Sequence, residues 1–350
     1  MTEVLTSGPE LDAYLRDLFK AIGIGAAQSA SIARNMTWSE LVGRRNFGVI
    51  RIPIHVKRIE HGVLNAIPKP KFSQTAASTG ILDGDNGFGY FTGELAMERA
   101  VKLAAATGIG MVVVNNSNFF GTGAYFADLA ARKGMLSLVL SNSFPKVVAH
   151  GGLKSVLGTN PFAFGSPRAQ GNNLLIDFAT SSLAGSTVRQ YLDQGKQLPE
   201  GLAIRPDGEP ETDPKKIGKA SLMPFGGAKG YGLSLMVEIL SGVLSGAGFS
   251  NSVKSTYSNF KEKSNSGHCM IAIDIEKFMP LEEFYGRLES FVGLLKLSNP
   301  DNEVLLPGEV RWRNYEHNSE HGIAIPEKII AELTAISEKY KVDCPWMVAG

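Results

Sequence analysis

Apolar residues recur at helical spacing along much of the chain. Near the N-terminus Leu11, Leu15, Leu18 and Phe19 lie three or four residues apart, and a second such pattern runs from about Ala27 to Leu41. The chain is therefore expected to open with two helices. The same periodicity predicts further helices over residues 94–107, 125–133, 230–244, 284–295 and 327–340.

Short apolar runs bounded by glycine or polar residues predict strands. They cover residues 110–114, 136–140, 162–164, 174–178 and 270–275. Strands and helices alternate irregularly, which favours an α/β fold with a mixed sheet over a simple doubly wound one. Two turn-rich stretches, 190–219 and 249–266, interrupt the pattern, and the first contains Pro199, Pro206 and Pro210. We interpret 190–219 as a mobile or lid-like surface segment rather than a core element.

A glycine-rich stretch, Gly87 to Gly93, precedes the expected helix 94–107. Its spacing is Gly-x-Gly-x-x-x-Gly, and the strand after the helix ends at Asn115 instead of the acid that would hold a ribose. A Rossmann fingerprint needs both features, so we interpret this stretch as an ordinary turn.

Composition excludes several classes of protein. The 350 residues contain 43% apolar side chains, with 35 basic and 34 acidic groups, which is typical of a globular protein of two or three domains. This balance gives no electrostatic reason to expect nucleic acid or an acidic membrane as a partner. Cys269 and Cys344 form neither a close pair nor a metal-binding spacing, so we expect no metal site. No run approaches the ~20 apolar residues of a membrane span, and a cytoplasmic protein is expected.

Short motifs along nearly the whole chain resemble those of the type-2 malate/L-lactate dehydrogenase family. Residues 46–53, Asn-Phe-Gly-Val-Ile-Arg-Ile-Pro, resemble its Ser-His-Gly-Val-x-Arg-x-Pro signature, and residues 116–121 resemble Asn-Ser-x-His-Phe-Gly. Further matches are Gly158-Thr159-Asn160-Pro161, residues 177–181, 226–232 and 267–274, and Pro307-Gly308-Glu309. The resemblance implies an NAD(P)-dependent oxidoreductase with a mixed, mainly antiparallel sheet, a non-Rossmann cofactor scaffold and a helical N-/C-terminal domain. It also implies a homodimer and a small-molecule carboxylate substrate.

The family's organisation implies two domains. Residues 1–125, joined by the helices of 280–350, would form the helical substrate domain, and residues 126–279 the cofactor-binding domain. By the same resemblance the cofactor-binding residues are Asp177, Ala179, Thr180, Ser181, Ser182, Lys229, Gly230, Gly308 and Glu309. Hydroxyls, backbone amides, glycines and one cation suit a diphosphate. The alternative is that the glycines only form a turn and that Lys229 is solvated. No residue pattern chooses NAD over NADP.

Arg51 matches the arginine of the first signature. A guanidinium holds a carboxylate through two parallel hydrogen bonds, which fixes the neighbouring carbon for hydride delivery. The alternative is a surface arginine near Arg44 and Arg45. Thr159, His150 and Asn142 are placed with Arg51 as substrate-binding residues.

Phe47 and Phe119 stand where the family has histidines, and Asn46 stands at the family's serine. Phenyl rings cannot exchange protons, whereas the alkoxide formed from a ketone needs a donor that typically contributes ~10²–10⁴-fold. A cyclic imine can be protonated in water beforehand, and aromatic faces attract the resulting cation. The sequence therefore favours a 2-imino acid as substrate, and a 2-oxo acid is the alternative.

Two histidines are candidates to replace the missing donors. His55 follows Phe47 and Arg51 at helical spacing, although Pro53 interrupts that inference, and His150 lies near the expected pocket. The catalytic set is thus His55, Arg51, Phe47, Phe119 and Asn46. Two alternatives stay open: a relative that binds the cofactor but has altered or lost catalysis, and a carrier or structural protein without a cofactor.

Overall fold

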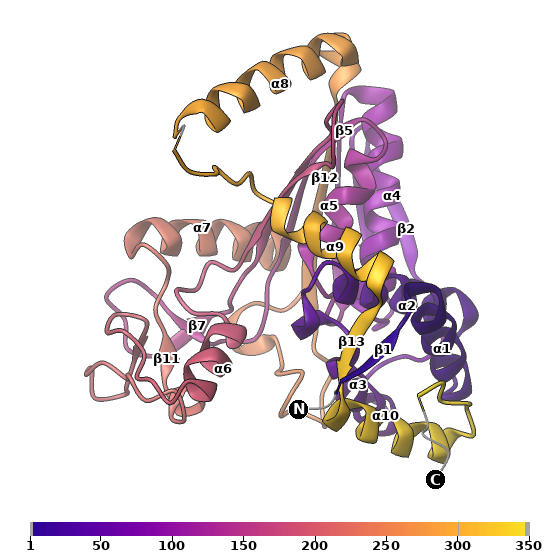
Figure 1. The fold of residues 1–350 in the computed structure, drawn as a ribbon, viewed down its shortest axis with the longest axis vertical. Coiled ribbons are helices and arrows are strands. Elements are labelled where there is room, and N and C mark those ends of the chain that lie inside the picture. Colours follow the sequence, from indigo (N-terminus) through magenta and orange to yellow (C-terminus); the bar gives the residue numbers. More distant parts are fainter. Residues whose placement is uncertain (1–2, 300, 347–350) are drawn as a thin grey trace.

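Helices from both ends of the chain form one unit of the fold (Figure 1). The computed structural model describes residues 3–299 and 301–346, and in it four helices share an apolar core: α1 (Gly8–Ala21), α2 (Ala26–Leu41), α3 (Ile52–Glu60) and α10 (Glu327–Tyr340). The residues that predicted the first helix, Leu11 to Phe19, form its buried face. β1 (Glu3–Thr6) pairs antiparallel with β13 (Ile323–Pro326), so strands near the two ends of the chain close this unit.

A seven-stranded sheet forms the centre of the molecule. Its order is β2-β3-β4-β12-β5-β8-β9, in which β3–β4 is parallel and the other pairs are antiparallel. The strands are β2 (Lys71–Ala76), β3 (Thr79–Asp83), β4 (Ile109–Ser117), β5 (Met135–Ser141), β8 (Phe162–Ser166), β9 (Leu174–Phe178) and β12 (Ser266–Asp274). The mixed, mainly antiparallel sheet expected from the sequence is therefore confirmed.

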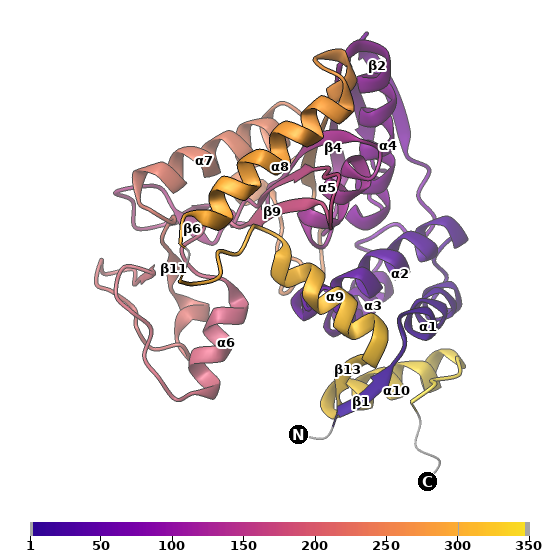
Figure 2. The ribbon, with the colours of Figure 1, turned by 45° about the horizontal axis from the view of Figure 1, so that its top comes forward.

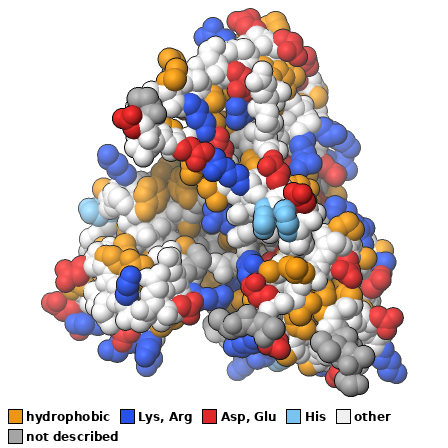
Figure 3. Space-filling view, in the orientation of Figure 1, with side chains coloured by type: hydrophobic (Ala, Val, Ile, Leu, Met, Phe, Trp, Pro, Cys, Tyr) orange, Lys and Arg blue, Asp and Glu red, His pale blue; other side chains and the backbone are white. Residues whose placement is uncertain are grey.

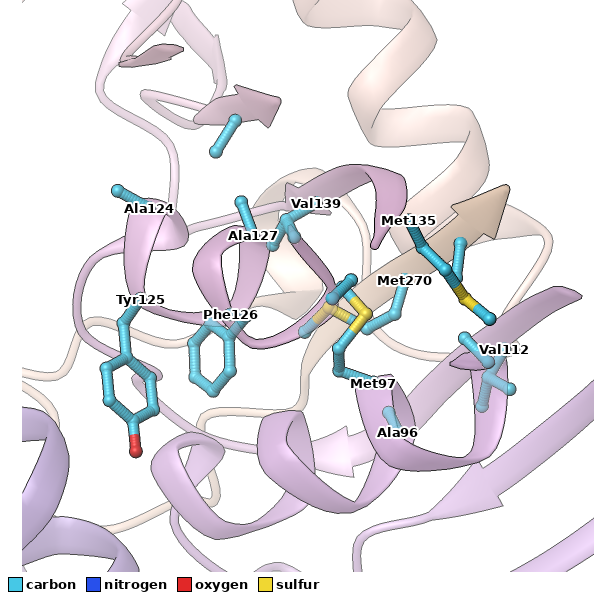
Figure 4. Packing of buried hydrophobic residues seen from close by; sticks show 14 of the residues in the cluster. Ala96, Met97, Val112, Ala124, Tyr125, Phe126, Ala127, Met135, Val139 and Met270 are labelled. Carbon is cyan, nitrogen blue, oxygen red and sulfur yellow. The ribbon is translucent and has the colours of Figure 1, made fainter. Parts of the chain in front are cut away.

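Both faces of this sheet are covered by helices. Side chains alternate across a strand, and in β4 Val112 packs with α4 (Gly89–Thr107) and α5 (Gly123–Ala131), while Val113 packs with α7 (Ala228–Glu238). Figure 4 shows the first of these cores, where Met97 of α4 lies beside Met270 of β12. α7 continues as a π-helical turn, η4 (Ile239–Val243).

The central sheet is continuous across residue 125. β2, β3 and β4 come from before this residue and the other strands from after it, and β4 pairs directly with β12. The division expected at residue 125 thus falls inside one sheet and its shared core. Local periodicity finds five of the seven strands, but it contains no information about which strands pair.

A smaller unit lies at the lower left of Figure 1. It contains α6 (Gly185–Asp193) and a four-stranded sheet of order β10-β11-β6-β7. The strands are β6 (Val147–Val148), β7 (Ser155–Leu157), β10 (Ala203–Ile204) and β11 (Ser221–Leu222). Leu198, Ala203 and Ile217 are buried in its own apolar cluster. The interpretation of 190–219 as a surface segment rather than a core element is therefore wrong, because its scattered apolar residues meet only after the chain folds back.

Two helices near the C-terminus complete the structure. α8 (Leu281–Leu297) extends along the outside of the molecule, and α9 (Glu309–His321) returns the chain to the helical unit (Figure 2). Short 3₁₀ turns are η1 (Arg45–Phe47), η2 (Val49–Arg51), η3 (Ile217–Lys219), η5 (Ser250–Ser252) and η6 (Ile275–Lys277). Among the described residues, no helix is long and apolar enough to cross a membrane.

The glycine-rich stretch 87–93 serves packing, and from Gly89 onward it is the start of α4 instead of the ordinary turn expected from the sequence. A Cβ at Gly89 would overlap the Asn118 carbonyl and Phe120, and one at Gly93 would lie 2.7 Å from Phe126. These glycines therefore allow α4 to approach its neighbours closely.

Candidate functional site

A buried glutamate shapes the segment that carries Arg51. Glu40, in the last turn of α2, accepts a hydrogen bond from the backbone N–H of Val49 at 2.8 Å. A Cβ at Gly48 would overlap the Glu40 carboxyl, so a larger residue there would displace that carboxyl from Val49 N–H. Burial raises the pKa of Glu40 to about 7. The chain consequently turns through η1 and η2 and places residues 46–51 beside the end of α2.

The Arg51 guanidinium is held at Nε, which leaves the edge formed by its two Nη groups available. Its Nε donates to the Asn46 carbonyl at 2.5 Å, and its Cζ lies 5.6 Å from the ring centre of Phe119 and 5.0 Å from that of Tyr257. Within residues 3–299 and 301–346, its two Nη groups have no hydrogen-bond partner. A guanidinium held at Nε and against aromatic rings keeps its outer donors for a carboxylate.

The two phenylalanines lie together beside Arg51. The rings of Phe47 and Phe119 are stacked, with centres 6.3 Å apart and planes inclined by 21°. Phe47 ends η1, and Phe119 follows β4 in a corner where Asn118 donates to Asn86 and Gly87. Residues about 70 positions apart in the sequence thus form one aromatic wall next to the guanidinium.

His55 lies beneath this wall. It is 1% exposed, its Nε2 lies 3.1 Å from the Tyr90 hydroxyl, and its Nδ1 has no partner in the described chain. Burial, together with the nearby charges of Arg51 and Arg58, lowers the pKa of His55 to about 3. Burial also raises the pKa of Tyr90. At neutral pH His55 is a neutral imidazole, separated from solvent by aromatic rings that include Phe119.

Tyr257 belongs to this group although no motif pointed to it. It lies in the turn-rich stretch 249–266, is 41% exposed, and its ring centre is 5.9 Å from that of Phe144. Its relation to Arg51 depends on how two distant loops meet. Local sequence carries no signal for that.

The remaining expected substrate residues each follow a strand: Asn142 follows β5, His150 follows β6 and Thr159 follows β7. The Thr159 hydroxyl is 3.3 Å from that of Ser143. Asn142 is 2% exposed, accepts from Gly267 N–H and donates to the Gly248 carbonyl, so its amide is engaged within the protein. His150 is exposed, and its ring lies about 3.8 Å from the Cβ position of Gly227. The structure therefore places His150 beside the glycine turn before α7.

The structure brings two expected cofactor segments side by side. Phe225 N–H donates to the Thr180 carbonyl at 3.1 Å, and Ser182 N–H donates to the Met223 carbonyl at 2.8 Å. Ser181 and Pro224 thus form an isolated antiparallel β-bridge. Ala179 precedes this pairing and is half-buried. Backbone groups of both segments are thus aligned at the start of α7.

The turn into α7 requires its glycines. Gly226 and Gly227 have φ of +56° and +62°, and a Cβ at Gly230 would overlap the Phe225 carbonyl. Lys229 is exposed in the first turn of the helix. A helix N-terminus with an exposed ammonium beside glycine backbone suits a diphosphate group, so these residues fit a dinucleotide.

Three of the expected cofactor-binding residues contact other parts of the protein: Asp177, Gly308 and Glu309. Asp177 accepts from the Thr122 hydroxyl at 2.6 Å and from Ala124 N–H, which caps α5. Gly308, with φ of +97°, lies against Leu175. Burial raises the pKa of Glu309, but the hydrogen bonds from Lys296 and the Leu306 N–H together lower it by more. The net pKa of Glu309 is therefore below its ordinary value.

Two cavities lie away from Arg51. One of about 690 Å³, between α1, α2, α5 and α9, has none of the expected site residues in its wall, and its Arg16 and Arg132 pair with Asp12 and Asp128. Another of about 200 Å³ includes Pro307 and Glu309. In the part of the chain that the structure describes, no three His, Cys, Asp or Glu side chains are grouped to hold a metal ion.

Comparison with known proteins gives consistent matches over almost the whole chain. The profile of the malate/L-lactate dehydrogenase family matches residues 7–334. A malate dehydrogenase of Pyrococcus abyssi is 38% identical over 344 residues, covering 95% of this chain and 94% of that protein. A Δ1-pyrroline-2-carboxylate/Δ1-piperideine-2-carboxylate reductase of Pseudomonas putida is 33% identical over 332 residues, covering 94% and 95%.

A solved structure agrees with these matches. The crystal structure of malate dehydrogenase from Entamoeba histolytica superimposes with a TM-score of 0.92 at 30% identity, covering 99% of this chain and 100% of that chain. The similarity in fold is therefore as extensive as the similarity in sequence.

Proposed function

Because the chain belongs to the malate/L-lactate dehydrogenase family, we propose that it is an NAD(P)H-dependent oxidoreductase that reduces a small 2-imino or 2-oxo carboxylic acid. The observation that carries the proposal is the guanidinium of Arg51, whose Nε is held by Asn46 while its outer donors are available beside Phe119 and Tyr257. Two parallel hydrogen bonds from this edge orient a carboxylate and the carbon next to it.

The cofactor is assigned to the paired segments 179–182 and 223–230. The glycine turn, the first N–H groups of α7 and the Lys229 ammonium offer donors and positive charge to a diphosphate. When bound there, a reduced nicotinamide supplies the hydride. His150, beside Gly227, is close enough to this turn to contact the cofactor, and its contact with the substrate stays a prediction.

The aromatic surroundings of Arg51 favour a cyclic imine over a ketone. Phe47 and Phe119 cannot donate a proton, and His55 is buried with its pKa lowered to about 3 by desolvation. A protonated imine needs no proton from the protein as its carbon accepts hydride, because its nitrogen already carries one. The wall of phenyl rings attracts such a cation by about 0.5–2 kcal/mol per ring.

Turnover with matched pairs of substrates tests this proposal. Cyclic 2-imino acids should be reduced much faster than 2-oxo acids of equal size, and imine turnover should fall as pH rises past the pKa of the substrate. Phe47→His with Asn46→Ser should selectively raise ketone turnover, because an internal donor helps only the reaction that forms an alkoxide.

Two further variants decide which group gives the proton. If Tyr257→Phe abolishes a fast ketone reduction, the phenol beside Arg51 is the donor and the preference for imines is wrong. If His55→Gln abolishes both reactions with cofactor binding unchanged, the imidazole is the donor.

A second function is a relative that binds the cofactor and has lost catalysis. The burial of His55 and the phenyl rings at Arg51 favour it, because a site without an acid is a poor ketone reductase. Tight binding of reduced nicotinamide, followed by fluorescence, with no turnover of either substrate class would establish this alternative.

We also propose that two copies of the chain associate. Apolar side chains are exposed along α7–η4 and along α8: Leu235, Ile239 and Val243 on the first, and Phe291, Leu294 and Leu297 on the second. In Figure 3 apolar side chains are visible in the hollow of this face beneath α8. Apolar surface exposed along two helices is typical of a contact between copies.

A further inference from the structure

We propose that Arg58 is a positioning residue of the substrate site, whose buried guanidinium fixes the loop 254–264 so that the ring of Tyr257 covers Arg51. The inference rests on the proposed function only in taking Arg51 as the group that binds the carboxylate. Neither Arg58 nor Tyr257 belongs to the motifs that pointed to the site.

Arg58 lies in α3 and is 1% exposed. Its Nη1 donates to the Asn259 carbonyl at 2.8 Å, and its Nη2 donates to the Ser264 hydroxyl at 2.9 Å and reaches the Asn118 side-chain oxygen at 3.5 Å. Among the described residues, no carboxylate pairs with it. A buried guanidinium that faces only neutral acceptors loses hydration without the compensation of an ion pair. An apolar side chain would fill the space at lower cost, so the donors themselves are what this position uses.

The three acceptors belong to the segments that surround Arg51. Asn259 follows Tyr257 by two residues, Asn118 directly precedes Phe119, and Arg58 lies seven residues after Arg51. Tyr257 and Phe119 are the two rings that contact the Arg51 guanidinium. A single side chain therefore joins the loop that carries Tyr257 to the segment that precedes Phe119.

The loop 254–264 is ordered as a unit. Lys254 N–H donates to the Ser264 carbonyl at 2.9 Å and closes its base, and the N–H groups of Tyr257 and Ser258 donate to the Ser255 hydroxyl. α3 makes further contacts with its tip: the Lys57 ammonium lies 4.3 Å from the ring centre of Phe260, and the His61 ring centre lies 5.2 Å from it. Movement of the loop away from α3 would thus carry Tyr257 off Arg51.

The expected effect of Arg58 is on carboxylate binding, acting through Tyr257. With the loop in place, the Tyr257 ring excludes water from one side of the guanidinium, which strengthens its bonds to an anion. A lysine at position 58 keeps the charge but presents a point donor on a single atom, and it cannot hold acceptors in two separate segments in the same way.

A double-mutant cycle on the full-length protein tests the inference. Affinity for pyridine-2-carboxylate, a planar ring with its nitrogen next to the acid, is measured by calorimetry for the parent, Arg58→Lys, Tyr257→Ala and the double variant. Each single change should weaken binding by about 5- to 10-fold. The double variant should be no weaker than Tyr257→Ala, because the proposed effect of Arg58 on carboxylate affinity passes through Tyr257. Losses that multiply in the double variant would overturn the proposal.

Hydrogen exchange gives a reading that does not depend on the proposed function. Arg58→Lys should speed exchange in residues 254–264 at least tenfold, whereas Tyr257→Ala should leave the loop protected. Unchanged exchange in Arg58→Lys overturns the positioning role even if binding is weaker. If the parent binds no carboxylate and reduces no imino or oxo acid, the proposed function fails, and faster exchange in this variant still supports the role of Arg58 in fixing the loop.

Two further variants guard against a general loss of stability. Ser264→Ala removes one acceptor with little disturbance and should shift affinity and exchange in the same direction by a smaller factor; if Arg58→Lys does not fold, this variant decides. Arg168→Lys alters another two-pronged contact, with Glu289, and should change neither reading. If Arg168→Lys changed affinity and exchange as much as Arg58→Lys does, the changes would reflect a general loss of stability.

Discussion

At the residue scale, the group around Arg51 combines one cation with aromatic rings and a histidine that cannot be charged near neutral pH. Burial holds the pKa of His55 to about 3, so its ring at pH 7 is neutral and bonded to Tyr90. Changes in the pH profile of turnover between pH 5 and 8 are therefore not expected to come from His55.

Arg51→Lys should raise the Michaelis constant of a carboxylate substrate by about tenfold or more and lower turnover as well, because a point cation cannot reproduce two-pronged orientation. Steady-state kinetics with a 2-imino acid measures both constants. The matching imine without a carboxyl serves as control and should be reduced equally by parent and variant. Equal losses for both substrates would remove the assigned role of Arg51.

Glu40 should make stability depend on pH. Burial raises its pKa from the ordinary 4.5 to about 7, so the folded protein binds the proton more tightly than the unfolded chain does. This contribution to folding is complete below pH 4.5 and is lost as pH rises through 7. Glu40→Gln can still accept from Val49 N–H and should gain roughly 1–3 kcal/mol relative to the parent between pH 5 and pH 8.

Urea unfolding of both proteins at pH 5 and pH 8 measures this difference. Glu98→Gln, on the exposed side of α4, is the control and should show no such change. A parent whose unfolding free energy responds to pH in the same way as that of Glu40→Gln would rule out titration of this carboxyl.

At the element scale, the first turn of α7 depends on close approach of its backbone to the preceding segment. A Cβ at Gly230 would overlap the Phe225 carbonyl, whereas one at Gly232 meets nothing within 4 Å. Gly230→Ala should therefore destabilise the protein by about 2 kcal/mol or more and weaken cofactor binding. Gly232→Ala should be neutral or stabilising by up to about 1 kcal/mol, because alanine favours a helix. Thermal unfolding of the two variants measures the difference in stability. Equal changes in stability for Gly230→Ala and Gly232→Ala would contradict the close packing of this turn.

Lys229, in the same turn, is expected to contribute to cofactor affinity. Lys229→Ala should reduce affinity for reduced nicotinamide dinucleotide by about 10- to 100-fold and leave the melting temperature unchanged, because a charge-assisted bond to phosphate is worth ~1.5–3 kcal/mol while an exposed lysine contributes little to folding. Calorimetric titration measures the affinity. Lys133→Ala, another exposed lysine, should bind as the parent does. Unchanged affinity in Lys229→Ala would place the phosphate site elsewhere.

At the scale of the whole molecule, α8 extends along the outside with Leu294 69% exposed and Leu297 74% exposed. A glutamate inside an interface between copies would be desolvated without a partner. Leu294→Glu should therefore shift the protein from dimer toward monomer in sedimentation at micromolar concentration. Leu5→Glu, at a comparably exposed apolar position on β1, should leave the oligomeric state as in the parent. A monomeric parent would contradict association of two copies.

How far the sequence predicts this molecule can be judged from particular elements. Helix 327–340 and strand 174–178 have the bounds expected from their periodicity. β2 and α9 were not predicted, because β2 is mostly exposed and α9 is largely polar, so neither has the alternation that burial on one face produces. Motif resemblance indicated Arg51, Phe47 and Phe119, and the structure brings these three together.

The sequence by itself determined the helices and strands with a strong apolar period, the family and the residues of its motifs, because these depend on neighbours within a few positions or on matched spacing. Only the tertiary structure decided that the central sheet crosses residue 125, that His55 is buried and neutral, and that Tyr257 and Arg58 complete the surroundings of Arg51. The physical reason is that pairing of strands, desolvation and contact between loops depend on residues far apart in the chain. Local pattern does not encode which of them meet.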